Sequence, residues 1–354
     1  KGLHNESIDL GFNHKSGLFV NGGYTRNNHG GWQGDLTGRE KRWHPKDQAL
    51  MNGMFGFQNR NMNVWYRLDF LDEKIFGPNN GSELQPEKVS DKDFLTKRYT
   101  HQLQSDWKLD NRLDVHAALS YQDYKRRTRT TESDLSTGEK WLSSAEASQD
   151  ITQYKAWIAR ATVAWNIAPE FSVQPGVEYQ WTQGEGGRID GTPKVSDLAF
   201  FLSAEYKPWE WLSLRPGVRT FIVADYDAPI AIPSVLTKFK LTKHMDLRLS
   251  YAYGFRSPTL QELYFSFHND NHDIDGNPDL KAEYSHNITG SVAYRVLHSE
   301  KIHLTTTLSG FYNDFRDKIS LAQNVDIPNY NTYYNIDRYN CCADWNTLFG
   351  VVYK

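Results

Sequence analysis

The feature that most constrains this chain is a two-residue alternation of apolar and polar side chains that recurs along nearly its whole length. In one clear case, Leu247, Leu249 and Tyr251 alternate with Arg248 and Ser250. Because successive side chains of a β-strand point to opposite faces, this pattern predicts a strand with one apolar and one wet environment. Similar runs occur at 113–121, 157–165, 171–181, 198–206, 212–222, 288–296 and 302–312. The sequence therefore predicts an all-β fold.

The connections between these runs fall into two length classes that alternate along the chain. Short connections are expected at 13–16, 59–61, 110–111, 168–170, 207–210, 242–244 and 297–300. Long polar ones are expected at 26–48, 72–97, 125–150, 183–195, 256–283 and 317–329. Short turns at one rim and long loops at the other are typical of an antiparallel bacterial outer-membrane β-barrel. Seven hairpins and a further run at 330–339 predict about fifteen strands.

Composition agrees with a barrel and excludes several other classes. Aromatic residues make up 14% of the 354 residues and gather near the ends of the runs, as at Trp157 and Trp165, where the girdles at the membrane interfaces are expected. A net charge of −3 gives no basic face for nucleic acid. Two adjacent cysteines, Cys341 and Cys342, are too few for a disulfide framework or a zinc site.

Other folds are less consistent with the pattern. Strands of a soluble β-sandwich average about five or six residues, whereas these runs reach ten or more. No window approaches the roughly 18 consecutive apolar residues of a membrane-spanning helix. The one stretch with any helical tendency, Ser143–Gln149, would form about two turns inside a loop. The N-terminus lacks the features of a signal peptide, which suggests that it lies within a longer protein.

Five short motifs identify a family resemblance. They are GFRSP at 254–258, QELY at 261–264, GNPDLKAE at 276–283, FYNDFRDKI at 311–319 and YNIDR at 334–338. In this order and spacing they resemble the C-terminal barrel half of the TonB-dependent outer-membrane receptors. The resemblance implies part of a 22-stranded transmembrane barrel in a bacterial outer membrane, with the barrel portion at residues 1–340. Such receptors bind scarce, bulky ligands at their extracellular loops and import them with energy delivered through TonB.

The sequence departs from this family in three respects. The plug domain, which carries the TonB-binding motif, is absent from the sequence, and about fifteen strands are fewer than twenty-two. Residues 341–354 form an atypical tail that does not continue the alternation. An incomplete barrel leaves two edge strands whose backbone N–H and C=O groups find no hydrogen-bond partners in lipid. We therefore expect the chain to be part of a receptor that does not transport by itself.

The resemblance implies haem or a ferric siderophore as the ligand, and it leaves cobalamin, glycans or a passive porin-like channel as alternatives. The motifs FRSP at 255–258 and NPDL at 277–280 resemble boxes that flank a ligand histidine in the haem-receptor subgroup, and His268 and His272 lie between them. Imidazole is a natural axial ligand of haem iron. The expected ligand-binding residues are His268, His272, Arg256, Tyr264 and Phe267, with aromatic rings stacking on a flat ligand. No resident cofactor or metal site is expected.

Three further features carry weaker hypotheses. Asn271–Gly276 resembles the start of a Ca²⁺ loop, but Ala282 stands where the closing glutamate belongs. The basic run Lys125–Arg129 is a candidate site for lipopolysaccharide phosphate or an anionic ligand, or a plain solvated loop end. Catalytic motifs such as G-x-S-x-G and H-E-x-x-H are missing, so an enzyme is not expected. A soluble, aromatic-rich carbohydrate-binding β-protein remains the alternative outside the membrane.

Overall fold

A computed structural model describes residues 2–145, 148–223, 229–269, 272–298, 302–323 and 330–353, with backbone alone at 223, 269, 272, 297–298, 302–303 and 338–353. Fifteen long strands and three short ones form a single sheet. The long strands are β1 (Leu3–Asn13), β2 (Leu18–His29), β3 (Lys46–Gln58), β4 (Met62–Gly77), β5 (Lys88–Lys108), β6 (Leu113–Asp134), β8 (Ile151–Ala168), β9 (Phe171–Glu185), β10 (Lys194–Trp209), β11 (Leu212–Val223), β12 (Ile232–Lys240), β13 (Met245–Arg256), β16 (Glu283–His298), β17 (Ile302–Gln323) and β18 (Tyr330–Tyr353). The short ones are β7 (Lys140–Leu142), β14 (Ser266–Asn269) and β15 (His272–Asp275). The prediction of about fifteen barrel strands is confirmed.

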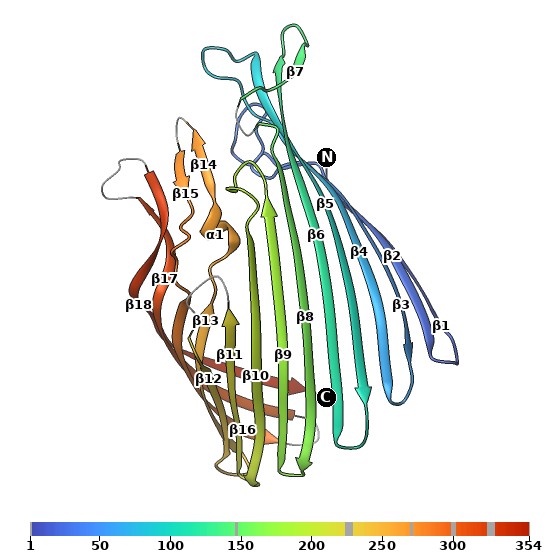
Figure 1. The fold of residues 1–354 in the computed structure, drawn as a ribbon, viewed down its shortest axis with the longest axis vertical. Coiled ribbons are helices and arrows are strands. Elements are labelled where there is room, and N and C mark those ends of the chain that lie inside the picture. Colours follow the sequence, from blue (N-terminus) through green and yellow to red (C-terminus); the bar gives the residue numbers. More distant parts are fainter. Residues whose placement is uncertain are drawn as a thin grey trace.

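Each long strand pairs antiparallel with the next long strand in the chain, and the connections alternate as predicted. The six short connections whose residues are described lie at the lower end of Figure 1, and the long connections that the structure describes lie at the upper end. The seventh short connection, predicted at 297–300, lies partly outside the described residues. The predicted loop boundaries were wrong in one consistent way, because several strands continue beyond them. For example, β4 and β5 remain paired up to Gly77 and Lys92, within a stretch expected to be a loop. The charged residues that suggested a loop there sit on strand extensions beyond the apolar band.

The two faces of the sheet differ as the alternation requires. One continuous row across β5, β6, β8 and β9 carries Leu103, Leu119, Ala159 and Tyr179, paired in register. Leu103, Leu119 and Tyr179 keep 43%, 39% and 41% of their surface exposed, although a soluble protein buries such residues. The opposite face carries polar side chains such as Glu178, which binds Arg160 and Arg219. In the described part of the chain all strands belong to one sheet and no second sheet packs on either face, unlike in a β-sandwich. An apolar face exposed in this way is the outer face expected of a membrane barrel.

Aromatic side chains mark two levels on the outer face. Trp157 and Trp165 on β8 are eight residues apart, as are Tyr99 and Trp107 on β5. Eight residues of extended strand span about 26 Å, close to the apolar band of about 25 Å in outer-membrane barrels. At the upper level the rings of Tyr121 and Trp157 lie 4.5 Å apart. These levels place the membrane between the short turns and the long loops.

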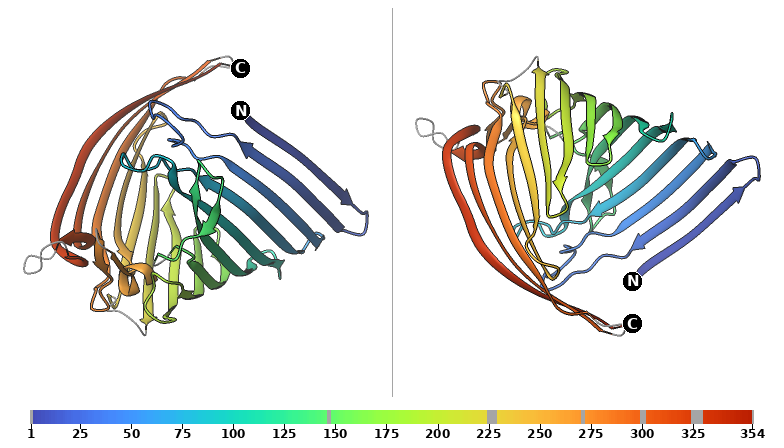
Figure 2. Two further views of the ribbon diagram at one scale, coloured as in Figure 1. Left: turned by 90° about the horizontal axis from the view of Figure 1, so that it is seen from above. Right: turned by 90° about the horizontal axis from the view of Figure 1, so that it is seen from below.

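The sheet curves strongly but does not close. Figure 2 shows β1 and β18 at the two sides of an opening, and β1 pairs with β2 alone among the described residues. The backbone of β18 continues through the predicted atypical tail to Tyr353 and remains paired with β17. No helix in the described residues is long and apolar enough to cross a membrane.

Candidate functional site

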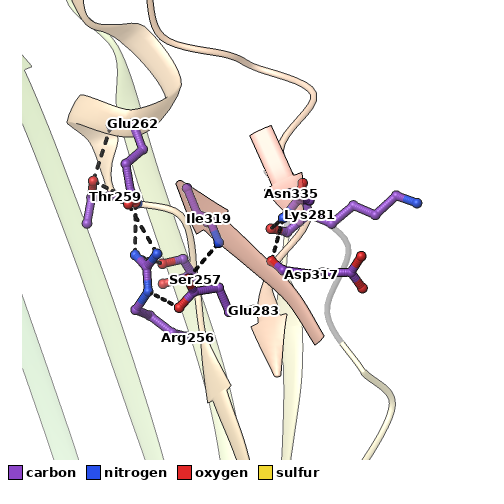
Figure 3. A network of polar contacts seen from close by, with 9 residues as sticks. All are labelled: Arg256, Ser257, Thr259, Glu262, Lys281, Glu283, Asp317, Ile319 and Asn335. Atoms are coloured by element: carbon purple, nitrogen blue, oxygen red, sulfur yellow. Dashed lines mark hydrogen bonds and ion pairs between the residues drawn. The ribbon is translucent and has the colours of Figure 1, made fainter. Parts of the chain in front are cut away.

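The family motifs meet in one polar network at the upper end of the sheet, centred on Arg256 at the end of β13 (Figure 3). Arg256 donates from Nη1 and Nη2 to the two carboxylate oxygens of Glu262, at 2.9 and 3.1 Å. Its Nε donates to Glu283 Oε2 at 2.5 Å. The loop between β13 and β16 is therefore tied at both ends to one guanidinium. Arg256, a predicted ligand-binding residue, has three nitrogens bonded to these carboxylates.

Glu262 belongs to a short helix, α1 (Leu260–Tyr264), that the sequence reading did not predict. Thr259 caps it: its hydroxyl accepts from the Glu262 amide at 3.2 Å, and its own amide donates to Glu262 Oε2 at 2.7 Å. This reciprocal pair is a capping box, and the Thr-x-x-Glu spacing at 259–262 was the available signal. In contrast, no helix is described at 143–145 or 148–149, where about two turns were expected.

The same network crosses to the following strands. Glu283 Oε1 accepts from the backbone amide of Ile319 on β17 at 2.6 Å. The Asn335 side chain on β18 donates to the carbonyls of Lys281 and Asp317, at 2.9 and 2.7 Å, and accepts from the Lys281 amide at 2.8 Å. Asp317 adopts a left-handed conformation with φ 49°, which places its carbonyl within this contact. Motifs distant in sequence thus form one polar network, which we call the clamp. It is made up of Arg256, Thr259, Glu262, Lys281, Glu283, Asp317, Ile319 and Asn335.

Beneath the clamp lies a small apolar cluster that seats α1 against the barrel wall. Its members are Ile189, Val195, Leu260, Leu263, Leu280 and Ile319, with Tyr154, Tyr264 and Tyr333 packed against it. Gly276 lies against the helix so closely that a Cβ there would come within 2.6 Å of the Leu263 backbone. Tyr264, predicted to stack on the ligand, packs in this cluster.

Between the clamped loop and the wall strands is a cavity of about 520 Å³, which we call the mouth cavity. Such a volume is within the range of about 300–1,000 Å³ for small-molecule sites. The wall contributes Tyr124, Arg126 and Tyr154, and the loop contributes Phe265 and Phe267. Its other lining residues are Lys92, Phe94, Thr128, Thr130, Ser148, Asp150, Thr152, Arg188, Ile189, Gln261 and His268.

The mouth cavity has an excess of positive charge. The Arg126 guanidinium lies 4.4 Å above the Phe94 ring, and that of Arg188 lies 4.1 Å above Phe267. Neither arginine has a carboxylate partner within the described ranges, and Arg126 Nε is buried without a hydrogen bond. The single lining carboxylate, Asp150, accepts bonds from the Thr152 hydroxyl and the Gly187 amide, at 2.7 and 2.6 Å. Cations held on aromatic rings without counter-ions favour an anionic ligand.

His268 lies at the edge of the mouth cavity on the β14–β15 hairpin. Its Nδ1 contacts Asp273 Oδ1, and its Nε2 lies 3.1 Å from both Asp275 Oδ1 and the Ser266 hydroxyl. The hydrogen bond with Asp273 raises the pKa of His268 above its ordinary value, because it favours the charged ring. The ring and the two carboxylates place ligand atoms within 4.8 Å of one another, a spacing that suits a divalent cation.

The structure thus brings together part of the predicted site. His268 and Phe267 line the mouth cavity, whereas Tyr264 and Arg256 anchor the loop. The side chain of His272 lies outside the described residues, as does Asn271 of the weak calcium hypothesis. Alternate residues of the basic run Lys125–Arg129 face opposite sides of the sheet, and Arg126 faces the cavity. Arg126 was considered only as part of that run, as a candidate for an anionic ligand, and Arg188 was missed.

A second hollow, of about 1,260 Å³, opens at the opposite rim beside Trp209 and Trp211. Among its charged lining residues, Lys207 and Arg215 bind Glu205, at 2.7 and 3.1 Å. The mouth cavity differs because its arginines lie over aromatic rings and because it is at the long-loop end. It is therefore the better candidate for ligand binding.

Comparison with known proteins agrees with these observations. The family model for the β-barrel of TonB-dependent receptor-like proteins matches residues 3–340. Hemoglobin and hemoglobin-haptoglobin-binding protein C of Haemophilus influenzae is 38% identical over 87 residues, 25% of this chain and 8% of that protein. Hemoglobin-haptoglobin utilization protein B of Neisseria meningitidis serogroup C is 36% identical over 98 residues, 27% of this chain and 12% of that protein.

Solved structures show the same fold at low sequence identity. The siderophore receptor PirA of Pseudomonas aeruginosa has a TM-score of 0.71 and 13% identity, over 98% of this chain and 58% of that one. The hemophore receptor HasR of Serratia marcescens, solved with its hemophore HasA and heme, has a TM-score of 0.67 and 14% identity, over 99% of this chain and 60% of that one. The chain thus spans less than two thirds of these receptors. The match of the barrel model across nearly all of it shows that the chain belongs to the TonB-dependent receptor family of the bacterial outer membrane.

Proposed function

We propose that the intact receptor containing this chain binds haem at the mouth cavity and imports it in a TonB-energised step. The observation that carries this proposal is the set of uncompensated cations, Arg126 and Arg188, held on aromatic rings beside His268. An anionic, flat, iron-containing ligand complements each part of this set. The protein's role is to bind, orient and release the ligand without altering its covalent structure.

Haem matches the lining group by group. Its two propionates are partners for the guanidinium groups of Arg126 and Arg188, since charge-assisted bonds to carboxylates are strong where water is partly excluded. Its porphyrin plane is suited to stacking on the aromatic lining that includes Phe265 and Phe267. His268 would provide the axial nitrogen, once a ring nitrogen is released from its carboxylate partner. Support also comes from the haemoglobin-binding proteins that share local sequence with this chain.

A ferric siderophore is the second candidate. Many ferric chelates are anionic, so the same arginines and Lys92 would bind one without any contribution from His268. The structural likeness to the siderophore receptor PirA is compatible with this, although at 13% identity it reflects the fold. The two candidates differ in what His268 is expected to do, which allows an experiment to separate them.

The test is growth of an iron-starved strain that depends on the intact receptor, with hemin or a ferric siderophore as the sole iron source. The doubly substituted variant R126Q/R188Q is expected to lose growth on hemin, while the matched variant R60Q/R112Q, changed at two short turns, grows normally. H268A should also fail on hemin, with the turn variant H244A as its control. Normal growth of R126Q/R188Q on hemin would refute the proposed site. Loss of siderophore growth, with hemin growth absent in the parent, would favour the second candidate.

A further inference from the structure

The β14–β15 hairpin gathers four polar side chains on one of its faces. In the register of the hairpin, His268 lies directly opposite Asp273, and Ser266 lies opposite Asp275. Because alternate residues of a strand share a face, all four side chains project from the same side. His268 and the two aspartates each place one ligand atom within 4.8 Å of the others, and the Ser266 hydroxyl lies 3.1 Å from His268 Nε2. The hairpin thus presents an imidazole, two carboxylates and a hydroxyl as one compact set.

The two carboxylates of the hairpin lack the cationic partners that other carboxylates of this loop have. Glu262 and Glu283, which belong to the clamp, share the guanidinium of Arg256. Asp273 and Asp275 form no ion pair with a lysine or arginine in the described part of the chain, where their one charged contact is with the imidazole. Two carboxylates this close together repel each other when both are ionised. A cation bound between them would remove that repulsion.

The hairpin is held against the barrel wall, which fixes the position of the two carboxylates. Asp273 and Asp275 pair in parallel register with Tyr330 and Thr332 of β18. The Tyr330 side chain also forms a hydrogen bond with Asp275. Such outer partners orient metal ligands and raise their affinity for the ion. The side chains of His268 and Asp273 remain 52% and 47% exposed, so an ion and its water ligands can reach them from outside.

The donor atoms of the hairpin suit a transition-metal ion of the zinc class. Zinc binds imidazole nitrogen and carboxylate oxygen at about 2.0–2.2 Å, so its ligand atoms lie about 3.4 Å apart in a tetrahedral site. Small rotations of partly exposed side chains would bring the three ligand atoms to that spacing. Calcium and magnesium prefer oxygen ligands alone, whereas an imidazole favours zinc.

We propose that the β14–β15 hairpin binds Zn²⁺ through a ring nitrogen of His268 and one oxygen each of Asp273 and Asp275, with water completing the coordination. The bound ion would join β14 to β15 and stiffen the loop side of the mouth cavity. No metal site was expected from the sequence, because the hairpin register that unites the three ligands was not predicted. The ion would also occupy the ring nitrogen that haem iron needs, a consequence that rests on the proposed function.

The test is a calorimetric titration with Zn²⁺ of the intact, tag-free receptor, purified in detergent, stripped with a chelator and kept free of hemin. In H268A and in D273N/D275N, zinc affinity at this site is expected to fall at least about tenfold, since the loss of a group that only supports a metal ligand already costs about 10–100-fold. Equal zinc binding by the parent and both variants would overturn the proposal.

Matched variants control for the loss of an imidazole or of two carboxylates elsewhere. H244A removes an exposed histidine at a short turn, and D35N/D279N removes two exposed aspartates outside the hairpin. Both should bind zinc as the parent does. A fall in zinc affinity in these variants equal to that in H268A and D273N/D275N would place the site elsewhere and overturn the assignment.

A measurement on the wild-type receptor keeps the inference testable if the hairpin variants assemble poorly. Zn²⁺ should slow amide hydrogen exchange in β14 and β15 several-fold, and EDTA should reverse the effect, while exchange in β5 and β6 stays unchanged. Unchanged exchange in the hairpin, or equal protection by Mg²⁺ or Ca²⁺, would overturn the proposal. Because zinc is titrated without hemin, a receptor that binds zinc at the hairpin but not hemin would refute the haem proposal alone.

Discussion

Arg256 binds Glu262 with both terminal nitrogens, at 2.9 and 3.1 Å, while its third nitrogen binds Glu283. This bidentate contact joins two motifs separated by a turn, and the contact with Glu283 joins a third motif 27 residues along the chain. A planar guanidinium suits this role because its donors are fixed in a fork that matches a carboxylate. The motifs that led to the family resemblance therefore act together as a clamp that holds the loop side of the mouth cavity.

Replacing Arg256 with alanine should loosen this clamp. Two half-buried carboxylates would lose their charged partner, a cost of roughly 1–3 kcal/mol after allowance for partial exposure of the arginine. We expect faster amide hydrogen exchange in α1 and in residues 276–283, with the exchange of β5 and β6 unchanged. R42A, which removes an exposed ion pair to Asp35, is the control and should have a smaller effect. Unchanged exchange in α1 of R256A would show that the clamp does not hold the loop.

Replacing Gly276 with alanine should disturb the close packing of the loop on α1. An alanine Cβ at this position would come within 2.6 Å of the Leu263 backbone, so the helix must move, at a cost of about 1–3 kcal/mol. The G276A receptor should assemble in the membrane but bind hemin several-fold more weakly. The control is G53A on β3, where an added Cβ meets nothing within 4 Å. Isothermal titration of both variants makes the comparison, and equal affinities would contradict the packing argument.

The pH dependence of haem binding should report on His268. Its pKa is raised, mainly by the hydrogen bond to Asp273, so the charged ring persists above the ordinary value of 6.5. The contribution of this ion pair to hairpin stability is complete below the unfolded pKa and is lost as pH rises through the folded pKa. Iron needs a neutral ring nitrogen, so axial ligation should strengthen over the same upward range.

Asp273 provides the variant for this prediction. Without the carboxylate, the pKa of His268 should fall, so D273N should reach full axial ligation at a lower pH than the parent. The measurement is the low-spin haem spectrum followed across the pH range in both receptors. If the spectra of the two receptors change at the same pH, Asp273 does not control the pKa of His268.

The strand pattern could be predicted because alternation along a barrel strand depends on local sequence and one lipid-facing side. The six short connections whose residues are described were predicted for this reason. The upper ends of the strands were harder to predict. The strands β4, β5, β6 and β17 extend beyond the membrane band, where both faces of the sheet meet water and the alternation of apolar and polar residues disappears. Helix α1 was missed because five residues show no helical period, although its capping box was visible at Thr259 and Glu262.

The site was predicted less completely than the fold. His268 followed from the family boxes and Phe267 from the loop aromatics expected to stack on a flat ligand, and both line the mouth cavity. Arg256 and Tyr264 lie in the same loop but point into the clamp and the apolar cluster, a distinction that depends on tertiary packing. Arg126 and Arg188 come from other segments of the chain and meet in the cavity only when β6 and the β9–β10 connection curve around it.

The most direct test of the central claim is a hemin titration of the intact receptor, plug included, purified in detergent and followed by visible absorption. We predict a saturable shift of the Soret band that is weakened several-fold in R126Q/R188Q and altered in shape in H268A, but unaffected in R60Q/R112Q and H244A. A titration with no saturable shift in the parent receptor would contradict haem binding. A shift that all four variants share would contradict its placement in the mouth cavity.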